Sequence, residues 1–362
     1  MRSIENLNYL VYVTERSDNV KVLVDELRKS NRRKVYITRE LPREAMKILK
    51  SKFYVEVWNG EMPPPKSLLI EKVKKADGLI CLLTEQIDEE VIDAAGPQLR
   101  GICQVAVGFD NIDVKAATKK GIHVTNTPGV LTETTADFAF TLLMATARRI
   151  AEADKYVKSG QWKVPWGLTM LLGQDIWEKT IGIVGIGRIG SAMARRAKGF
   201  KMNILYYDIY RNEQIEKELG IKYVPLEKLL KESDYVTIHV PLMPETHHLI
   251  NEDRLRIMKK TACLINTSRG PVVDEKALYK ALKEGWIWAA GLDVWEKEPV
   301  DLSNFLLKLD NVTVAPHISS GSIATRTKMA VMAAENMVAI QEGRAPPNLV
   351  NKETLEVRPS TK

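Results

Sequence analysis

Short apolar runs alternate with amphipathic stretches along most of the chain, from Lys34 onward. In the first part of the chain this alternation predicts strands at residues 35–38, 54–58 and 78–83 and helices at residues 42–50, 68–75 and 89–94. Strands that alternate with helices are typical of a parallel sheet with helices on both faces. We therefore expect one such sheet before residue 131.

A second alternating set begins near Asp175 and runs to about Pro316. Before it, residues 132–150 form a long apolar segment whose Thr-then-Glu start is typical of a helix N-terminus, and we expect the chain to cross between domains there. Residues 325–341 again show a helical pattern. A helix at that position would return to the first domain and make it discontinuous.

The fold class that follows is α/β, with two doubly wound parallel-sheet (Rossmann-like) domains. At 362 residues the chain is long enough for two domains with a core each. The predicted parts are residues 33–131 with 317–345, residues 132–316, an N-terminal extension at 1–32 and a polar tail at 346–362.

The formal net charge of +7 first suggests a nucleic-acid partner. Basic and acidic residues are mixed along helical stretches such as 227–232, however, which is more typical of solvated faces than of a phosphate-binding patch. No apolar run approaches the roughly 20 residues of a membrane helix, and the N-terminus lacks a secretory layout. We expect a cytoplasmic protein that binds neither nucleic acid nor membrane.

Cysteine usage adds no further chemistry. Cys81, Cys103 and Cys263 each lie inside an apolar run, and none has a partner at metal-ligand spacing. We expect reduced thiols in buried strands and no metal site.

A Gly-Ile-Gly-Arg-Ile-Gly motif at 185–190 follows a predicted strand and precedes a predicted helix. Gly185 permits a tight turn, Gly187 lets the backbone approach a pyrophosphate, and Gly190 allows close helix–strand contact. The pyrophosphate would then lie at a helix N-terminus. A lone motif of this kind is weak evidence, but strand, helix and an acidic residue at the end of the next strand agree here.

That acidic residue is Asp208, which closes the predicted strand at 204–207. A carboxylate at this position accepts hydrogen bonds from ribose hydroxyls and repels a 2′-phosphate, so it favours NAD over NADP. Arg211 is close enough in sequence to weaken the preference. The alternative is that Asp208 only forms the turn at the strand end.

Three further residues suit the reduction of a 2-oxo acid, which needs a cation for the carboxylate and a protonated acid for the developing alkoxide. His317 follows a predicted strand, and ligands of open α/β sheets bind outside such carboxyl ends. Arg269 also follows a strand, and its planar fork suits a carboxylate. A carboxylate beside an imidazole raises the imidazole pKa and fixes its tautomer. Glu298 is the candidate for this, with Glu296 as a rival in the same loop.

These motifs carry a close resemblance to one family. The matching segments are residues 105–113, 126–130, 185–190, 239–241, 266–270, 291–299 and 316–318. Over residues 33–350 the chain resembles the D-isomer-specific 2-hydroxyacid dehydrogenases, and among them the microbial glyoxylate/hydroxypyruvate reductases. A short-form D-3-phosphoglycerate dehydrogenase is the nearest alternative. Formate dehydrogenases are disfavoured, because that branch has a Gln–His pair in place of Glu298–His317.

The resemblance implies a substrate (catalytic) domain at 33–131 and 317–345, an inserted NAD-binding domain at 132–316, and an active site in the interdomain cleft. It implies that Arg269 holds the substrate, that His317 donates the proton, and that Glu298 lies against His317. Backbone N–H groups of Val107 and Gly108 would bind the substrate carboxylate. The residues implied at the cofactor are Gly185, Gly187, Arg188, Ile189, Gly190, Asp208, Val240, Pro241, Thr267, Ser268, Asp293 and His317.

The resemblance further implies NAD(P)-dependent reduction of glyoxylate or hydroxypyruvate to glycolate or D-glycerate, and Asp208 makes NADP the less favoured cofactor. Close glyoxylate reductases often have a small or basic residue at the Asp208 position, so this chain departs from them there. Such enzymes are homodimers through the coenzyme domain, and the Trp-rich residues 161–177 fall where the family has a dimer arm, although core packing is nearly as well supported. A different class, NAD-binding corepressor-like proteins, keeps the same fold and is the other alternative.

Overall fold

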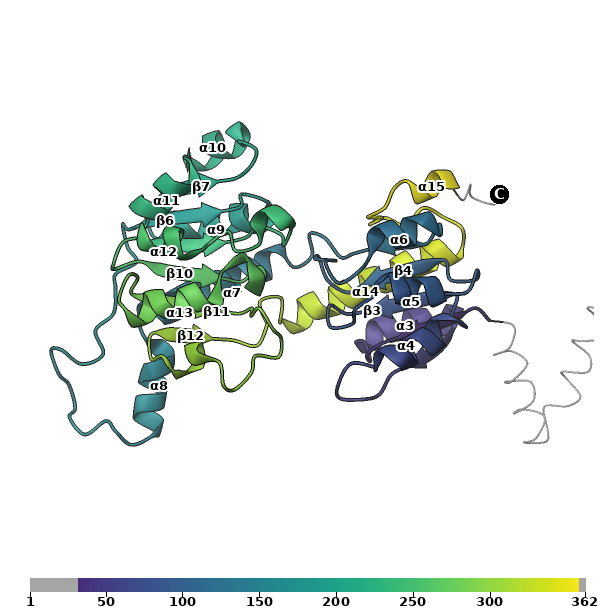
Figure 1. Ribbon diagram of the computed structural model, residues 1–362, viewed down its shortest axis with the longest axis horizontal. Coiled ribbons are helices and arrows are strands. Elements are labelled where there is room, and N and C mark those ends of the chain that lie inside the picture. Colours follow the sequence, from purple (N-terminus) through teal and green to yellow (C-terminus); the bar gives the residue numbers. More distant parts are fainter. Residues whose placement is uncertain (1–31, 358–362) are drawn as a thin grey trace, which may run out of the picture. The chain divides into compact units, whose positions relative to one another are not determined.

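The computed structural model describes residues 32–357, so the predicted N-terminal extension lies outside the described residues except for Arg32. The chain divides into two compact units (Figure 1). Unit 1 comprises Met1–Pro128 and Arg326–Lys362, and unit 2 comprises Gly129–Thr325. Residues 317–325 thus belong to unit 2, whereas the sequence pattern put them in the first domain.

Unit 1 contains a five-stranded parallel sheet in the order β2-β1-β3-β4-β5. The strands are β1 Lys34–Ile37, β2 Tyr54–Val57, β3 Gly78–Cys81, β4 Gly101–Gln104 and β5 His123–Thr125. The helices are α3 Arg43–Lys52, α4 Lys66–Val73, α5 Glu89–Ala94, α6 Val114–Lys119, α14 Ile323–Gln341, which begins in unit 2, and α15 Thr354–Val357. One core of this unit packs α4, α5 and α6 on apolar strand residues such as Leu79 and Ile102.

The described residues after Pro346, up to Val357, do not form the polar tail that the sequence pattern suggested. Leu349 forms an antiparallel bridge with Thr125, and the backbone N–H of Val350 donates to Val124 O at 2.8 Å. The buried Asn351 side chain accepts from Val124 N at 2.8 Å and donates to Ile122 O at 2.9 Å. Because one amide side chain satisfies two backbone groups at the end of the sheet, this segment is anchored to unit 1.

Unit 2 contains a seven-stranded parallel sheet in the order β12-β11-β10-β9-β6-β7-β8. The strands are β6 Thr180–Val184, β7 Asn203–Tyr207, β8 Lys222–Tyr223, β9 Tyr235–Ile238, β10 Cys263–Asn266, β11 Ala289–Leu292 and β12 Val312–Val314. The helices are α7 Thr132–Ala147, α8 Ile150–Lys158, α9 Arg188–Gly199, α10 Glu213–Leu219, α11 Leu226–Glu232, α12 Glu252–Arg256 and α13 Glu275–Lys283, with 3-10 turns η1 Pro244–Thr246, η2 Gly270–Val272 and η3 Phe305–Lys308. Both sheets are doubly wound, so the predicted fold class is confirmed.

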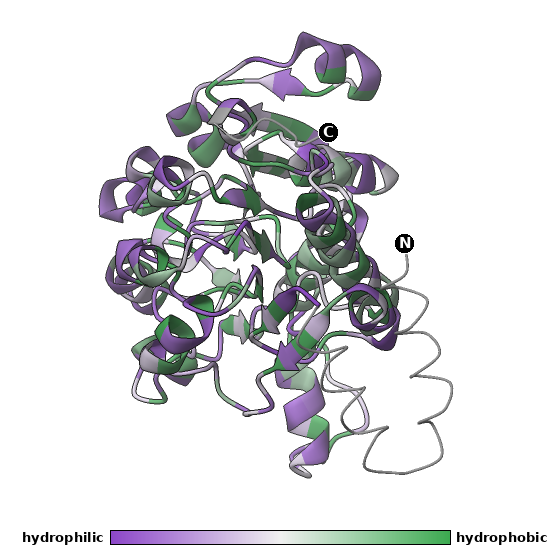
Figure 2. Cartoon of the chain, turned by 90° about the vertical axis from the view of Figure 1, so that its right-hand side faces the viewer, coloured by the Kyte–Doolittle hydropathy of each residue, from purple (hydrophilic) through white to green (hydrophobic). Residues whose placement is uncertain are grey.

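Strand residues of unit 2 alternate between two cores, one on each face of the sheet. In β10, Cys263 and Ile265 belong to the core with α7 and α9, whereas Leu264 belongs to the core with α11, α12 and α13. This is the two-residue period of a strand buried on both faces. In Figure 2 the strands are mostly green, while the covering helices carry purple stretches.

The predicted helix at 132–150 ends earlier than expected. α7 stops at Ala147, and Arg149 adopts a left-handed conformation with φ of 54° before α8 begins. α8 has no buried residue, and α8 with its following loop extends away from the unit 2 sheet (Figure 1). The apolar pattern alone could not show this break, because it depends on one residue's backbone angle.

All three cysteines are free and buried in strands, as predicted. Burial raises the pKa of the Cys103 thiol to about 12. Of the described helices, none is long and apolar enough to cross a membrane.

Candidate active site

The glycine motif lies in unit 2 between neighbouring strands β6 and β9, where the strand order reverses. Ligands of doubly wound sheets bind at the carboxyl ends of the strands at such a switch point. Gly185, directly after β6, has φ of 95°, and a Cβ there would lie 2.9 Å from the carbonyl carbon of His239. A Cβ on Gly190 would lie 2.0 Å from Gly185 O. Both positions therefore require glycine to bring α9 close to the sheet.

Two observations fit this turn to a dinucleotide. Gly187 is the N-cap of α9, and no side chain caps this helix end. A Cβ on Gly187 would meet no described atom within 4 Å. The first N–H groups of α9 are thus left for an anion such as a pyrophosphate. In addition, the buried hydroxyl of Thr267 has no hydrogen-bond partner among the described residues. Such orphaned polar atoms are uncommon unless a ligand or water completes them.

Asp208 lies at the end of β7 and holds the glycine turn. Its Oδ2 accepts from Ile186 N at 2.8 Å, and its Oδ1 accepts from Ile209 N at 2.7 Å. The turn-forming interpretation of Asp208 is therefore correct as far as it goes. It does not compete with ribose binding, because each carboxylate oxygen keeps a second lone pair. A surface pocket beside it is lined by Ile186, Gly187, Asp208, Tyr210, Arg211, Asn212 and Glu213.

Other residues assigned to the cofactor by resemblance lie around the same strand ends. Arg188 and Ile189 open α9, and Val240 and Pro241 follow β9. A Cβ on Gly185 would lie 3.0 Å from Val240 Cγ1, so this side chain borders the turn. Their contacts with a cofactor remain predictions.

The loop after β10 is organised by Asn266, whose structural role the sequence did not reveal. Asn266 Oδ1 accepts from Ser268 N at 3.0 Å and from Ser268 Oγ at 2.9 Å, and its Nδ2 donates to Arg269 O at 2.8 Å. Next in the chain, Gly270 packs directly on the loop after β11: a Cβ there would lie 1.8 Å from the carbonyl carbon of Trp295. Arg269 and the 295–298 loop are thereby held against each other.

The contact between His317 and Glu298 that the resemblance implies is present. His317 Nδ1 donates to Glu298 Oε2 at 2.7 Å, and Glu298 Oε1 accepts from Trp295 N at 3.0 Å. The other ring nitrogen, Nε2, has no hydrogen-bond partner among the described residues. Burial alone would raise the pKa of Glu298, but the hydrogen bond and charge of His317 leave that pKa below its ordinary value. The Glu298 carboxylate therefore orients the imidazole of His317 through Nδ1.

The rival carboxylate, Glu296, has other partners. Its Oε1 lies 3.0 Å from His248 Nε2 and accepts from Glu275 N at 3.2 Å. Glu275 in turn accepts from Glu296 N at 2.6 Å. Neither Glu296 oxygen contacts His317, so the two acidic residues of the loop have separate tasks.

Asp293 fixes the backbone of the catalytic candidate. His317 has φ of 55°, a conformation that costs a non-glycine residue free energy unless its surroundings enforce it. Asp293 O accepts from His317 N at 2.7 Å, and its carboxylate accepts from Ile318 N and Ser319 N at 2.8 Å each. Burial raises the pKa of Asp293, although these N–H groups oppose the rise. Its predicted cofactor contact stays a prediction.

His239, at the end of β9, is a different kind of histidine. Burial lowers its pKa to about 4, so the ring is neutral near pH 7. A hydrogen bond of 2.9 Å joins its Nε2 to Thr237 Oγ1. The backbone of this residue borders the glycine turn at Gly185.

Val107 and Gly108 belong to unit 1, in the loop after β4. Asn126 Nδ2 donates to Val107 O at 2.8 Å, and Gln104 Nε2 donates to Gly108 O at 3.3 Å. The N–H groups of Val107 and Gly108 have no partner among the described residues. The loop thus presents backbone donors, as the resemblance implies, and Asn126 and Gln104 are supports that the sequence did not single out.

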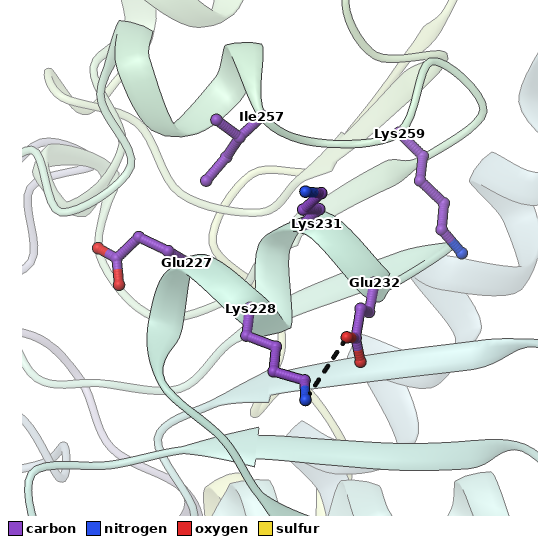
Figure 3. Close-up of a pocket in the computed structure, with 6 residues that line it drawn as sticks. All are labelled: Glu227, Lys228, Lys231, Glu232, Ile257 and Lys259. Atoms are coloured by element: carbon purple, nitrogen blue, oxygen red, sulfur yellow. Dashed lines mark ion pairs between the residues drawn. The ribbon is translucent and has the colours of Figure 1, made fainter.

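Figure 3 shows a further surface pocket of unit 2, on α11 and after α12. It is lined by Glu227, Lys228, Lys231, Glu232, Ile257 and Lys259. None of the predicted site residues lines it, and Lys228 pairs with Glu232 within α11 at 3.7 Å. Within residues 32–357, no group of His, Cys, Asp and Glu residues could hold a metal ion.

Comparisons with known proteins identify the family of the chain. Residues 140–319 match the family described as D-isomer specific 2-hydroxyacid dehydrogenase, NAD binding domain. A glyoxylate reductase of Korarchaeum cryptofilum is 61% identical over 90% of this chain and 98% of its own, and one of Pyrococcus horikoshii is 54% identical over the same shares. The structure of an NADPH-dependent glyoxylate/hydroxypyruvate reductase of Sinorhizobium meliloti with NADP and malonate is 32% identical, with a TM-score of 0.79 over 90% of this chain and 98% of that chain.

Proposed function

The chain belongs to the D-isomer specific 2-hydroxyacid dehydrogenases, oxidoreductases that act on the CH–OH group of 2-hydroxy acids, and from this premise we propose that it reduces glyoxylate or hydroxypyruvate. The observation that carries the proposal is the His317–Glu298 pair, at 2.7 Å, in loops that follow strands of the same sheet as the glycine turn. Relatives named glyoxylate reductase at 61% and 54% identity support this substrate class.

In the proposed reaction, Arg269 binds the substrate carboxylate and His317 Nε2 donates a proton to the carbonyl oxygen. The nicotinamide cofactor, when bound, supplies the hydride to the carbonyl carbon. Glu298 keeps the Nδ1 proton in place and stabilises the protonated imidazole before transfer.

The cofactor in this proposal is NAD rather than NADP. Asp208 places a carboxylate beside the pocket of Tyr210 and Arg211, where it accepts from ribose hydroxyls and repels a 2′-phosphate. The Sinorhizobium relative is NADPH-dependent, so the preference is a property of this chain's residues rather than of the family.

The proposed assembly is a homodimer through unit 2. The segment from Gln161 to Trp177 exposes a run of large apolar side chains: Trp162, Val164, Trp166, Leu168, Leu172 and Trp177. An exposed apolar set of this size, rich in Trp, is typical of a protein interface.

A substrate panel tests the function. Oxidation of NADH, followed by its absorbance, is expected with glyoxylate and hydroxypyruvate and to be weaker with pyruvate and 2-oxobutyrate. Faster turnover of 3-phosphohydroxypyruvate would favour a phosphoglycerate dehydrogenase instead. NADH binding without turnover of any 2-oxo acid would refute the proposal and favour a corepressor-like role.

A further inference from the structure

Arg211 is the cation among the described residues that line the pocket beside Asp208. A guanidinium at this position is the group that a 2′-phosphate on the adenosine ribose would need, because its planar fork matches phosphate oxygens. Its side chain is about half exposed, at 56%, so solvent and ligands can reach it. By composition alone, the pocket could therefore accept either dinucleotide.

The fork of Arg211 is already engaged by Glu216 of α10. Arg211 Nε donates to Glu216 Oε1 at 2.8 Å, and Nη2 donates to Oε2 at 2.8 Å. This bidentate pairing uses one edge of the guanidinium and neutralises its charge. We call this pairing of Glu216 with Arg211 the clamp. The hydrogen bonds from Arg211 and Tyr206 lower the pKa of the Glu216 carboxyl to about 2, so Glu216 is charged near neutral pH.

Glu216 is itself held in place from below. The phenol of Tyr206, a fully buried residue of β7, donates to Glu216 Oε1 at 2.6 Å and accepts from Asn212 N at 2.9 Å. Asn212 caps α10 through its side chain, which accepts from Ile215 N at 3.1 Å. The Glu216 side chain is only 15% exposed. Strand, loop and helix thus fix the carboxylate before any ligand arrives.

We propose that Glu216 is a specificity-determining residue of this enzyme, because it withholds Arg211 from a 2′-phosphate and so enforces the choice of NAD. The inference rests on the proposed preference for NAD and adds a residue outside the pocket lining. With the clamp in place, a 2′-phosphate meets the carboxylates of Asp208 and Glu213 and no uncommitted fork edge of Nε and Nη2. Without the clamp, the guanidinium of Arg211 is no longer paired with Glu216 and can bind the 2′-phosphate.

The test measures binding rather than turnover. Dissociation constants for NADH and NADPH are determined by calorimetry on the full-length wild type, Glu216→Gln and Glu216→Ala. Glu216→Gln keeps the shape of the side chain but removes its charge, and we expect it to improve NADPH affinity relative to NADH by about tenfold, the value of one charge-assisted hydrogen bond. Glu216→Ala, which removes both acceptors, shifts the ratio further in the same direction.

Two controls separate the clamp from general electrostatics. Glu213→Gln removes a carboxylate that lines the same pocket but makes no hydrogen bond with Arg211, so its shift is expected to be smaller. The double variant Arg211→Gln/Glu216→Gln is expected to return to the ratio of Arg211→Gln alone, because the gain passes through Arg211.

The outcomes are distinct. An unchanged ratio in both Glu216 variants of a protein that favours NADH overturns the clamp but leaves the proposed function intact. An equal shift in Glu213→Gln, or a gain that survives in the double variant, also overturns it. A wild type that favours NADPH refutes the proposed preference itself. The fragments 5′-AMP and 2′,5′-ADP, measured in parallel, assign any shift to the adenosine end.

Discussion

Single residues around His317 divide into those that hold its ring and those that hold its backbone. Glu298 contacts Nδ1 of the ring, whereas Asp293 accepts hydrogen bonds from the backbone N–H groups of residues 317–319. The neighbouring Glu296 contacts neither. Glu298 and Asp293 therefore support His317 in different ways, and substitution of each can separate the two effects.

Replacing His317 with Ala removes the proposed proton donor. We expect kcat for glyoxylate reduction to fall by about 10²- to 10⁴-fold, the usual contribution of general acid catalysis. Steady-state NADH oxidation measures the loss. The matched control is Glu296→Gln in the neighbouring loop, which should keep kcat near that of the wild type. Equal rates for His317→Ala and wild type would show that the proton has another source.

A second residue-scale prediction concerns His239. Its pKa is about 4 in the folded chain and about 6.5 when unfolded, so the unfolded chain binds more protons between those values. The contribution of His239 to folding stability is therefore lost as the pH falls from about 6.5 to 4, by up to roughly 3 kcal/mol. His239→Gln should flatten this loss in chemical unfolding at pH 7 and pH 4.5. Exposed His247→Gln serves as the control and should leave the slope unchanged.

Some residues of the candidate site could be predicted from the sequence, and others could not. The glycine motif could be recognised because Gly185 and Gly190 have no room for a side chain, while Gly187 leaves space where a pyrophosphate is expected. Residue chemistry alone could not choose between Glu296 and Glu298, since both are acids of one loop, and only the resemblance favoured Glu298. The pairing of Arg211 with Glu216 could not be predicted from the sequence, because it depends on side-chain rotamers and on a hydrogen bond from the buried Tyr206 phenol.

At the scale of elements, the β6–turn–α9 segment combines glycines with different reasons to be there. A Cβ at position 190 would collide with the carbonyl oxygen of Gly185, whereas one at position 187 would enter space free of described atoms. Gly190 is therefore required by the fold, and Gly187 is expected to make room for the ligand.

Alanine substitutions should separate these two roles. We expect Gly190→Ala to destabilise unit 2 by about 1–3 kcal/mol, the usual cost of overpacking. Gly187→Ala should keep its melting temperature but bind NADH at least about tenfold more weakly, because its methyl group would meet the pyrophosphate. Thermal unfolding and calorimetric titration measure the two effects. A Gly187→Ala protein with wild-type NADH affinity would remove the pyrophosphate from this turn.

Element boundaries could be predicted where hydrophobic periodicity was uninterrupted. Strands such as β6 and β10 are mostly apolar and almost fully buried, because both faces of the sheet are covered. The end of α7 could not be predicted, because it depends on the positive φ of Arg149, which a pattern of apolar positions does not show. Similarly, the C-terminal segment has a polar composition, yet the Asn351 amide anchors it to β5.

At the scale of the whole molecule, two doubly wound units were foreseeable from the repeated strand–helix order. What the order could not provide was the extent of each unit, because residues 317–325 belong by contact to unit 2 although the last strand, β12, ends at Val314. Those residues carry the backbone that Asp293 holds.

The proposed homodimer is testable through the exposed apolar segment. We expect the wild type to sediment as a dimer and Leu168→Asp, at a side chain 77% exposed, to raise the dissociation constant at least about 30-fold, as for an interface hot spot. Leu302→Asp, at a side chain 89% exposed outside this segment, is the matched control and should not dissociate the dimer. A monomeric wild type, or equal effects of both variants, would contradict the prediction.

The backbone contact between Gly270 and Trp295 has a mechanical consequence. With no room for even a methyl group between them, the strand-end turn that carries Arg269 and the loop that carries Glu298 cannot slide past each other. We therefore expect Arg269 and Glu298, the groups proposed to bind the carboxylate and to orient the proton donor, to move together as one rigid body when substrate binds.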